Sequence, residues 1–333
     1  MHKNFIESLN GMGMGLLATL VVGTILRQIG MLFDLPLLLT IGGYAQGFMA
    51  AAIGIGVASA LNSKPIVIFA CIVTASIGAQ AVNLVDGGLI LTVGDPAGAY
   101  ISALATALVG NLIAGKTKLD ILIVPMICLL LGGLVALFAG PTITHFTNAL
   151  GTFINNATQM HPILMGMIVA VIFCLVILSP LSSAALAVGL GLSGLAGGAA
   201  VVGCASSMVG FAVSSYRDNG ISGLFTQGIG TSKIQFGNFI KNPAIAIPTI
   251  IAALITGPLS TAVFELHTNS LGAGMGTSGL VGQIQTIAEM GTNAIWMIVL
   301  VQIAIPGIIA LLIGQFLYKK GFIRKGDMIL PRG

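Results

Sequence analysis

The chain has 333 residues, of which 56% are hydrophobic and 7% are charged, and its mean hydropathy is +1.06. Soluble domains usually carry about 25% charged residues, so this composition excludes an ordinary soluble protein and predicts a polytopic membrane protein. The net charge of +4 comes from scattered basic residues and does not indicate nucleic-acid binding. The four cysteines lie singly in apolar runs, which predicts small buried side chains and neither a disulfide nor a metal site.

Apolar runs of about 20 residues, long enough to cross a bilayer, recur along the chain and predict an all-α fold with about ten transmembrane helices. The predicted spans are residues 11–30, 42–61, 65–84, 97–114, 121–140, 163–178, 243–263 and 294–317, together with two short helices within residues 181–215 that turn near residues 194–198. Residues 141–162, which include His145 and His161, predict an amphipathic helix at the membrane surface.

The basic residues indicate an orientation. Lys116, Lys118 and the C-terminal cluster at residues 319–325 fall on one side of a ten-span arrangement, and Arg27 is the exception. Cytoplasmic loops are enriched in Lys and Arg, so both termini are predicted to be cytoplasmic. No cleaved signal peptide is expected at the N-terminus.

The even number of spans and their polar interruptions suggest two halves, residues 1–160 and 161–333. Inverted repeats are frequent in transporters, which makes pseudo-symmetry between the halves an expectation. The sequence carries no strong self-similarity, so this expectation rests on the span count.

A polar patch at residues 78–100 provides the first candidate site residues. Polar side chains inside a membrane are costly and usually functional, so Gln80, Asn83 and Asp95 are predicted to face a translocation path. A proline follows Asp95 directly and indicates a turn, and a carboxylate there also suits the N-terminus of a helix that begins near Ala97. The two interpretations of Asp95, solute contact and helix cap, are compatible.

The second patch, residues 265–289, is polar and rich in glycine, lacks Lys and Arg, and lies between two predicted spans. Irregular backbone at membrane depth needs protein or a water-filled cavity around it, so we expect a re-entrant segment that contributes to a polar solute site. Gly274 belongs to a GxGxxG match, but no strand pattern precedes it, which argues against a dinucleotide site. Thr277 and Ser278 are predicted to begin a helix whose free N–H groups face the solute, with an extracellular loop as the alternative.

Three ionisable residues stand at the ends of this segment. Glu265, His267 and Glu289 are predicted to contact sugar hydroxyls or to couple protons, and a solvated position at the outer surface is the alternative. No nucleophile with a neighbouring base and no clustered metal ligands are present in the sequence, so we expect no enzyme, cofactor or metal site. The predicted solute-binding residues are Gln80, Asn83, Asp95, Glu265, His267, Gly274, Thr277, Ser278, Gln283 and Glu289.

Four long strings carry a resemblance to a known family. They are VGDPAGAYISALATALVGNLIAGKTKLDILIVP, LSPLSSAALAVGLGLSGLAGGAAVVGCASSMVGFAVSSYRDNG, QGIGTSKIQFGNFIKNP and GPLSTAVFELHTNSLGAGMGTSGLVGQ. These strings resemble the EIIC-like membrane proteins of the bacterial phosphotransferase system, a group that includes proteins labelled as the perfringolysin O regulator. The resemblance covers nearly the whole chain.

The resemblance implies a permease that moves a sugar or another small polar solute across the bacterial cytoplasmic membrane by alternating access. It also implies a homodimer and separate EIIB and EIIA partner proteins, of which EIIB phosphorylates the sugar, with transport without phosphorylation as the alternative. By this likeness, residues 219–241 and 271–289 form two re-entrant hairpins of a C-terminal substrate domain, and the first five spans supply the dimer contact. A small-molecule sensor or regulator that acts through a partner protein is the alternative, and an integral membrane enzyme is least expected.

Overall fold

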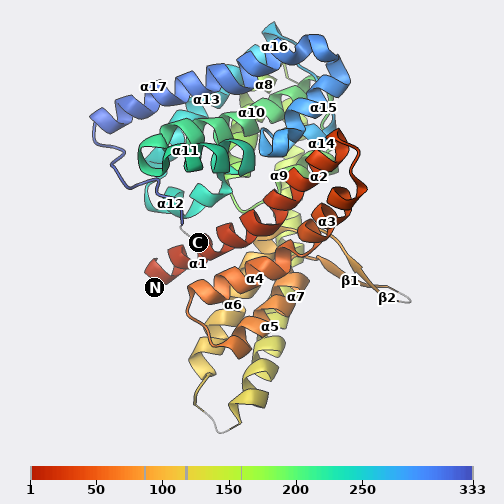
Figure 1. Cartoon of the computed structure of the whole chain (residues 1–333), viewed down its shortest axis with the longest axis vertical. Coiled ribbons are helices and arrows are strands. Elements are labelled where there is room, and N and C mark those ends of the chain that lie inside the picture. The colour runs from red at the N-terminus through yellow and green to blue at the C-terminus, as the bar shows by residue number, and fades with distance from the viewer. Residues whose placement is uncertain (1, 86–87, 117–118, 159, 332–333) are drawn as a thin grey trace. The chain divides into compact units, whose positions relative to one another are not determined.

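The computed structural model describes residues 2–85, 88–116, 119–158 and 160–331 (Figure 1). Within these residues, six helices are long and apolar enough to cross a membrane, or seven if the bent pair Pro36–Gly47 and Met49–Ala60 forms one span. The predicted all-α polytopic fold is therefore confirmed, whereas the number of about ten spans stays a prediction. Lys118, on which part of the predicted orientation rests, lies outside the described residues.

The chain forms two compact units, residues 1–146 and residues 147–332, and the boundary between them falls inside the helix α7 (Asp120–Thr158). The span predicted at residues 121–140 corresponds to the apolar span Asp120–Ile143, whereas the prediction of a separate surface helix at residues 141–162 was wrong. One helix of 39 residues continues through Pro125 and Pro141. A proline removes one backbone hydrogen bond but holds a helical φ, and apolar helices tolerate that loss. The roles predicted for residues 1–160 and 161–333 stay predictions.

The first unit is built from apolar helices that pack closely through small residues. In chain order they are α1 (His2–Leu16), α2 (Val22–Leu32), α3 (Pro36–Gly47), α4 (Met49–Ala60), α5 (Pro65–Gly78) and α6 (Pro96–Ile113), followed by the first part of α7, and the π-helical turn η1 (Leu17–Val21) joins α1 to α2. Gly11 of α1 meets Gly56 of α4, where a Cβ on Gly56 would stand 2.1 Å from the Gly11 carbonyl oxygen. The two helices reach this distance because neither residue has a side chain.

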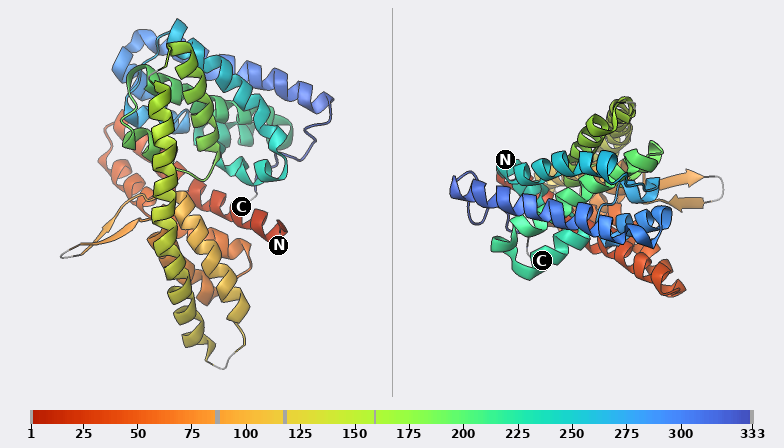
Figure 2. Two further views of the ribbon diagram at one scale, coloured as in Figure 1. Left: turned by 180° about the vertical axis from the view of Figure 1, so that it is seen from behind. Right: turned by 90° about the horizontal axis from the view of Figure 1, so that it is seen from above.

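A β-hairpin takes the place of the last part of the span predicted at residues 65–84. α5 ends at Gly78, and β1 (Val82–Val85) pairs antiparallel with β2 (Gly88–Leu91). Gln80 has a φ of 54°, a left-handed conformation that ends a helix. The predicted helix was too long because apolar composition alone does not separate a helix from a short strand. The hairpin projects from the helices of its own unit (Figures 1 and 2).

The second unit is organised around α10, whose side chains are almost all buried and which packs against α8, α13 and α17. Its helices are α8 (Pro162–Leu178), α9 (Ser183–Gly189), α10 (Gly194–Ser214), α11 (Tyr216–Phe225), α12 (Phe236–Lys241), α13 (Ile247–Pro258), α14 (Ser270–Ala273), α15 (Val281–Met290), α16 (Ile295–Ile298) and α17 (Ile305–Lys319). They are joined by the short helical turns η2 (Thr226–Gly230), η3 (Ser232–Gln235), η4 (Pro243–Ala246), η5 (Leu259–Val263), η6 (Ser278–Leu280), η7 (Thr292–Ala294) and η8 (Val299–Ala304).

The turn in the small-residue run at 181–215 lies earlier than predicted. α9 ends at Gly189, and α10 begins at Gly194 and is long enough to span a membrane. The prediction of two short helices with a turn at residues 194–198 was therefore wrong in its position and in the length of the second helix. The small residues of α10 serve close packing: a Cβ on Gly203 would stand 2.1 Å from the Ala170 carbonyl oxygen of α8.

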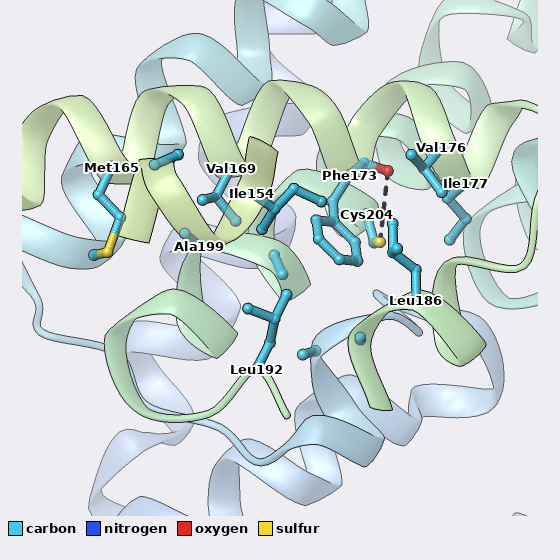
Figure 3. Packing of buried hydrophobic residues seen from close by; sticks show 14 of the residues in the cluster. Ile154, Met165, Val169, Phe173, Val176, Ile177, Leu186, Leu192, Ala199 and Cys204 are labelled. Atoms are coloured by element: carbon cyan, nitrogen blue, oxygen red, sulfur yellow. Dashed lines mark hydrogen bonds between the residues drawn. The ribbon is translucent and has the colours of Figure 1, made fainter. Parts of the chain in front are cut away.

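The core of the second unit lies between α8, α9 and α10. Met165, Val169 and Phe173 of α8 pack with Leu186 of α9 and Cys204 of α10 (Figure 3). The Cys204 thiol donates a hydrogen bond to the Phe173 carbonyl oxygen at 3.7 Å. All four cysteines are buried and free, as the sequence predicted.

Candidate functional site

Residues 264–291 fold into short helices between two apolar spans, Pro243–Val263 and Thr292–Lys319. The segment is broken by left-handed backbone at Glu265, Gly276, Gly279, Leu280 and Gly291. The short helices α14 and α15 lie on either side of the breaks at residues 276–280. The structure therefore gives this polar stretch an interrupted helical form rather than a single extended loop.

The helix start predicted at Thr277 and Ser278 needs correction. These two residues open only the single turn η6, and α15 begins at Val281. Gly279 and Leu280 of this turn, with φ values of 54° and 59°, place a left-handed break directly before the helix. The N–H groups at the start of α15 thus follow Leu280 and not Thr277.

Gly276 lets this segment pack closely against α10. A Cβ at this position would stand 2.7 Å from the backbone and side chain of Cys204, and the φ of 53° also favours glycine. The neighbouring Thr277 is buried, and its hydroxyl donates to the Met208 sulfur of α10 at 3.6 Å. Gly274 packs in the same way against the Ser183 carbonyl group of α9. The predicted residues Gly274 and Thr277 are therefore buried against α9 and α10, and Ser278 is also buried.

A pair of buried amides lies between this segment and the last span. Gln283 of α15 is 6% exposed and Gln302 of η8 is fully buried, and the Gln283 Nε2 donates to the Gln302 Oε1 at 2.7 Å. The other two amide atoms, Gln283 Oε1 and Gln302 Nε2, have no hydrogen-bond partner within the described part of the chain. Buried polar atoms usually find a partner, so each of these needs an explanation.

Sequence reasoning included Gln283 but missed Gln302. Gln302 lies in the π-helical turn η8, and such turns are frequent at functional sites. The sequence does carry a signal for Gln302, because an uncharged amide with apolar neighbours on both sides in a span is itself a candidate for function.

The ionisable residues of the segment lie at the surface of the second unit. Glu265, His267 and Glu289 are all exposed, although Leu266 between the first two is buried. The His267 backbone N–H donates to the Met290 sulfur at 3.1 Å, which places residues 267 and 290 side by side. Contact between these three side chains and a solute stays a prediction.

The remaining predicted residues gather at the base of the β-hairpin in the first unit. Gln80 and Asn83 are exposed, and Asp95 is half-buried. The Asp95 N–H donates to the Ala79 carbonyl oxygen at 2.9 Å, and the Asn83 side chain donates to the Gln80 carbonyl oxygen at 3.4 Å. Asp95 Oδ1 accepts hydrogen bonds from the N–H groups of residues 97 and 98, which confirms the predicted helix cap. A role of the three residues in translocation stays a prediction.

The second segment predicted to be re-entrant, residues 219–241, forms α11, η2, η3 and α12 and is held by a network of amides. Gln235 donates to the Gln227 Oε1 at 2.9 Å and to the Met328 carbonyl oxygen at 2.9 Å. Asn238 donates to the Gln235 Oε1 and to the Ile329 carbonyl oxygen, both at 2.8 Å. The segment after α17 therefore returns to η3 and α12 and supplies main-chain partners for their amides, and Asn219 of α11 also donates to the Met328 carbonyl oxygen (Figure 1).

Lys233 is the only charged side chain that is buried within the described residues. Its ammonium group donates to the carbonyl oxygens of Ser179 at 2.8 Å, Val176 at 3.5 Å and Leu181. These carbonyls lie at and just beyond the C-terminal end of α8, where the helix dipole favours a positive charge. Lys233 thus closes the end of a helix.

Arg27, which departs from the predicted orientation, is held within the first unit. Its guanidinium donates to the Gln46 Oε1 at 2.8 Å, and the Gln46 Nε2 donates to the Thr24 hydroxyl at 2.8 Å. This chain of hydrogen bonds provides partners for polar side chains of α2 and α3, which lie among apolar helices.

Within the described residues, no group of three His, Cys, Asp or Glu side chains is arranged to hold a metal ion.

A model of the protein family described as "Phosphotransferase system, EIIC" matches residues 6–330, which is nearly the whole chain. A search of curated proteins found no match.

Proposed function

The chain belongs to the phosphotransferase-system EIIC family, and we propose that it carries a sugar or another small polar solute across the bacterial cytoplasmic membrane by alternating access. The observation that carries this proposal is the interrupted segment at residues 264–291, with polar side chains buried between two apolar spans. Lipid offers no hydrogen-bond partners to the free backbone N–H and C=O groups of a broken helix. A transport site lined by protein provides such partners and can therefore contain broken helices. Discontinuous helices are a recurring way of building solute sites in transporters.

The backbone breaks also supply places at which the segment can move. α15 is bounded by left-handed residues at both ends, Leu280 and Gly291. A short helix held between two such positions turns as a unit when the backbone angles at its ends change, as hinge residues do in gated proteins. We propose that movement of α15 opens the buried polar residues to one side of the membrane at a time.

In this proposal, residues 161–333 form the substrate domain and residues 1–160 supply the contact of a homodimer. Thr277, Ser278 and Gln283 contact the solute, supported by the burial of all three side chains. Glu265, His267 and Glu289 stand at the mouth of the path. Separate EIIB and EIIA proteins act with the chain on the cytoplasmic side, where EIIB phosphorylates the delivered sugar, and the family membership supports this assignment.

Uptake into liposomes tests the proposed function. The purified full chain is reconstituted, and radiolabelled sugars and polyols are presented outside, with empty liposomes as the control. We expect saturable uptake of at least one of these solutes. Solute binding without uptake of any of these sugars and polyols would contradict the transporter proposal and favour a small-molecule sensor.

Thiol labelling tests the proposed orientation. All four native cysteines are buried, so a cysteine introduced at the exposed Lys116 is read against a low background. We expect Lys116→Cys to resist an impermeant thiol reagent added outside intact cells and to react after the cells are opened. Ready labelling from outside would place this loop, and with it the predicted cytoplasmic termini, on the other side.

A further inference from the structure

The unpaired atoms of the Gln283–Gln302 pair define the hydrogen bonds that a bound group must make. Gln283 Oε1 is a carbonyl acceptor and Gln302 Nε2 is an N–H donor, and both are buried without a partner in the described part of the chain. If the oxygen and nitrogen positions of both amides are exchanged, the pair again keeps one free acceptor and one free donor. The requirement therefore does not depend on how the amides are assigned.

We propose that Gln283 and Gln302 together bind an uncharged solute through its hydroxyl groups, and that Gln302 is a specificity-determining residue of the transport site. This inference rests on the proposed function and adds Gln302 and the free donor and acceptor of the amide pair to its site. A hydroxyl group donates to the free carbonyl oxygen and accepts from the free N–H, so it satisfies both amides. Sugars and polyols carry several hydroxyl groups on neighbouring carbons.

The same pair of atoms disfavours ions. A cation would meet the N–H donor of Gln302, and an anion would meet the carbonyl oxygen of Gln283. A counter-charge is also lacking among buried residues, because Lys233 is the only buried charge in the described residues and donates to carbonyl oxygens around the end of α8. An ionised solute at a buried site without a counter-charge loses its hydration without compensation.

The two amides belong to elements that can separate. Gln283 lies in the short helix α15, between the left-handed positions Leu280 and Gly291, whereas Gln302 lies in the π-helical turn of the last span. In the structure each amide provides a hydrogen-bond partner for one atom of the other. A movement of α15 away from η8 exposes four amide atoms at once, and a solute hydroxyl pair replaces the lost hydrogen bond.

Substitution of both glutamines by methionine tests the inference without an unpaired atom in the core. Methionine has nearly the shape of glutamine, and removing both partners of a buried hydrogen bond is close to neutral for stability. The matched control is Gln315→Met, which changes an exposed glutamine of α17. Folding of every variant is checked by gel filtration and thermal unfolding in detergent.

The experiment measures equilibrium binding and liposome uptake of a fixed panel by the full chain. D-mannitol and D-glucose present hydroxyl groups, uracil presents an amide edge, and D-gluconate and D-glucosamine present charges of opposite sign. We expect binding of a hydroxylated, uncharged member by the wild-type chain and by Gln315→Met. The Gln283→Met/Gln302→Met chain should bind it at least about tenfold more weakly, the usual effect when buried polar groups that read a solute are lost.

Each other outcome has a defined meaning. Unchanged binding and uptake in the double variant would overturn the inference and leave the proposed function in place, with the amide pair holding a structural water only. Preference for uracil, gluconate or glucosamine would overturn the solute class while transport stands. If the wild-type chain neither binds nor takes up any panel member, the inference and the proposed function both fail.

Discussion

Two groups of buried amides in the second unit differ in how completely their hydrogen bonds are made. Gln227, Gln235 and Asn238 form a continuous network, and each of their side-chain NH₂ groups makes two hydrogen bonds. Gln283 and Gln302 make a single hydrogen bond to each other and leave one acceptor and one donor free. The comparison separates amides whose hydrogen bonds stabilise the fold from amides whose free atoms are available to bind a ligand.

The partners of the complete network explain its role. Gln235 and Asn238 donate hydrogen bonds to the carbonyl oxygens of Met328 and Ile329, in the segment that follows the last span. The Asp218 carboxylate accepts hydrogen bonds from the backbone N–H groups of Gly326 and Met328 in the same segment. Because the partners are main-chain groups of the protein itself, this network needs no further molecule and holds the C-terminal segment on α11 and α12.

The largest effect is expected where the complete network is broken. Gln235→Met removes one hydrogen bond each from the Gln227 Oε1, the Met328 carbonyl oxygen and the Asn238 amide, so the free energy of unfolding should fall by about 3 kcal/mol. Unfolding by SDS in mixed micelles measures it. Gln315→Met, at an exposed position of α17, is the control and should change stability by less than about 0.5 kcal/mol. Equal effects of the two changes would contradict the structural role of the network.

A smaller loss of stability is expected where the interrupted segment packs against α10. Gly276→Ala places a Cβ 2.7 Å from Cys204 and also strains a φ of 53°, so we expect a loss of about 2 kcal/mol. Gly191→Ala, just after α9, is the control, because its φ of 61° is close to that of Gly276 but no atom stands within 4 Å of the added Cβ. Gly191→Ala should cost about 1 kcal/mol. A smaller loss at residue 276 than at residue 191 would show that the segment does not pack against α10 as described.

Substitutions at Gln283 and Gln302 should change the free energy of unfolding in a different way from Gln235→Met. Gln283→Met and Gln302→Met each leave one amide without its partner and should lower the free energy of unfolding by about 1 kcal/mol. The double variant should recover most of that loss, giving a positive coupling in a double-mutant cycle. Additive losses would mean that the two glutamines do not share a hydrogen bond in the folded protein.

The smallest effect is expected at Asp95 in the first unit, where the cap and the predicted solute contact can be separated. Asp95→Ala removes an N-cap and should cost about 1 kcal/mol, whereas Asp95→Asn keeps an acceptor for the same N–H groups and should cost less than about 0.5 kcal/mol. Solute uptake is measured on both variants. Weaker uptake by the well-folded Asp95→Asn protein would support the translocation role, and unchanged uptake would confine Asp95 to capping.

Hydropathy predicted the membrane fold, and the turn signal at Asp95 predicted the start of α6. The same reasoning placed the end of α5 and the break before α10 wrongly, because Gly, Ala and Ser serve both turns and close helix packing. Gln283 was found because it lies in an evidently polar stretch, and Gln302 was missed because apolar neighbours surround it. Their pairing depends on how α15 folds back, and local sequence does not encode that long-range contact.

Fluorescence of the single tryptophan tests the central claim most directly. Trp296 meets Phe264 edge to face with ring centroids 5.8 Å apart, and Phe264 packs against the buried cluster that contains Val301, next to Gln302. The titrant is the panel sugar or polyol with the greatest uptake into liposomes. We expect a saturable change of Trp296 emission in the wild-type chain and its loss in Gln283→Met/Gln302→Met. The same titration curve in both proteins would contradict the claim that the amide pair binds the solute.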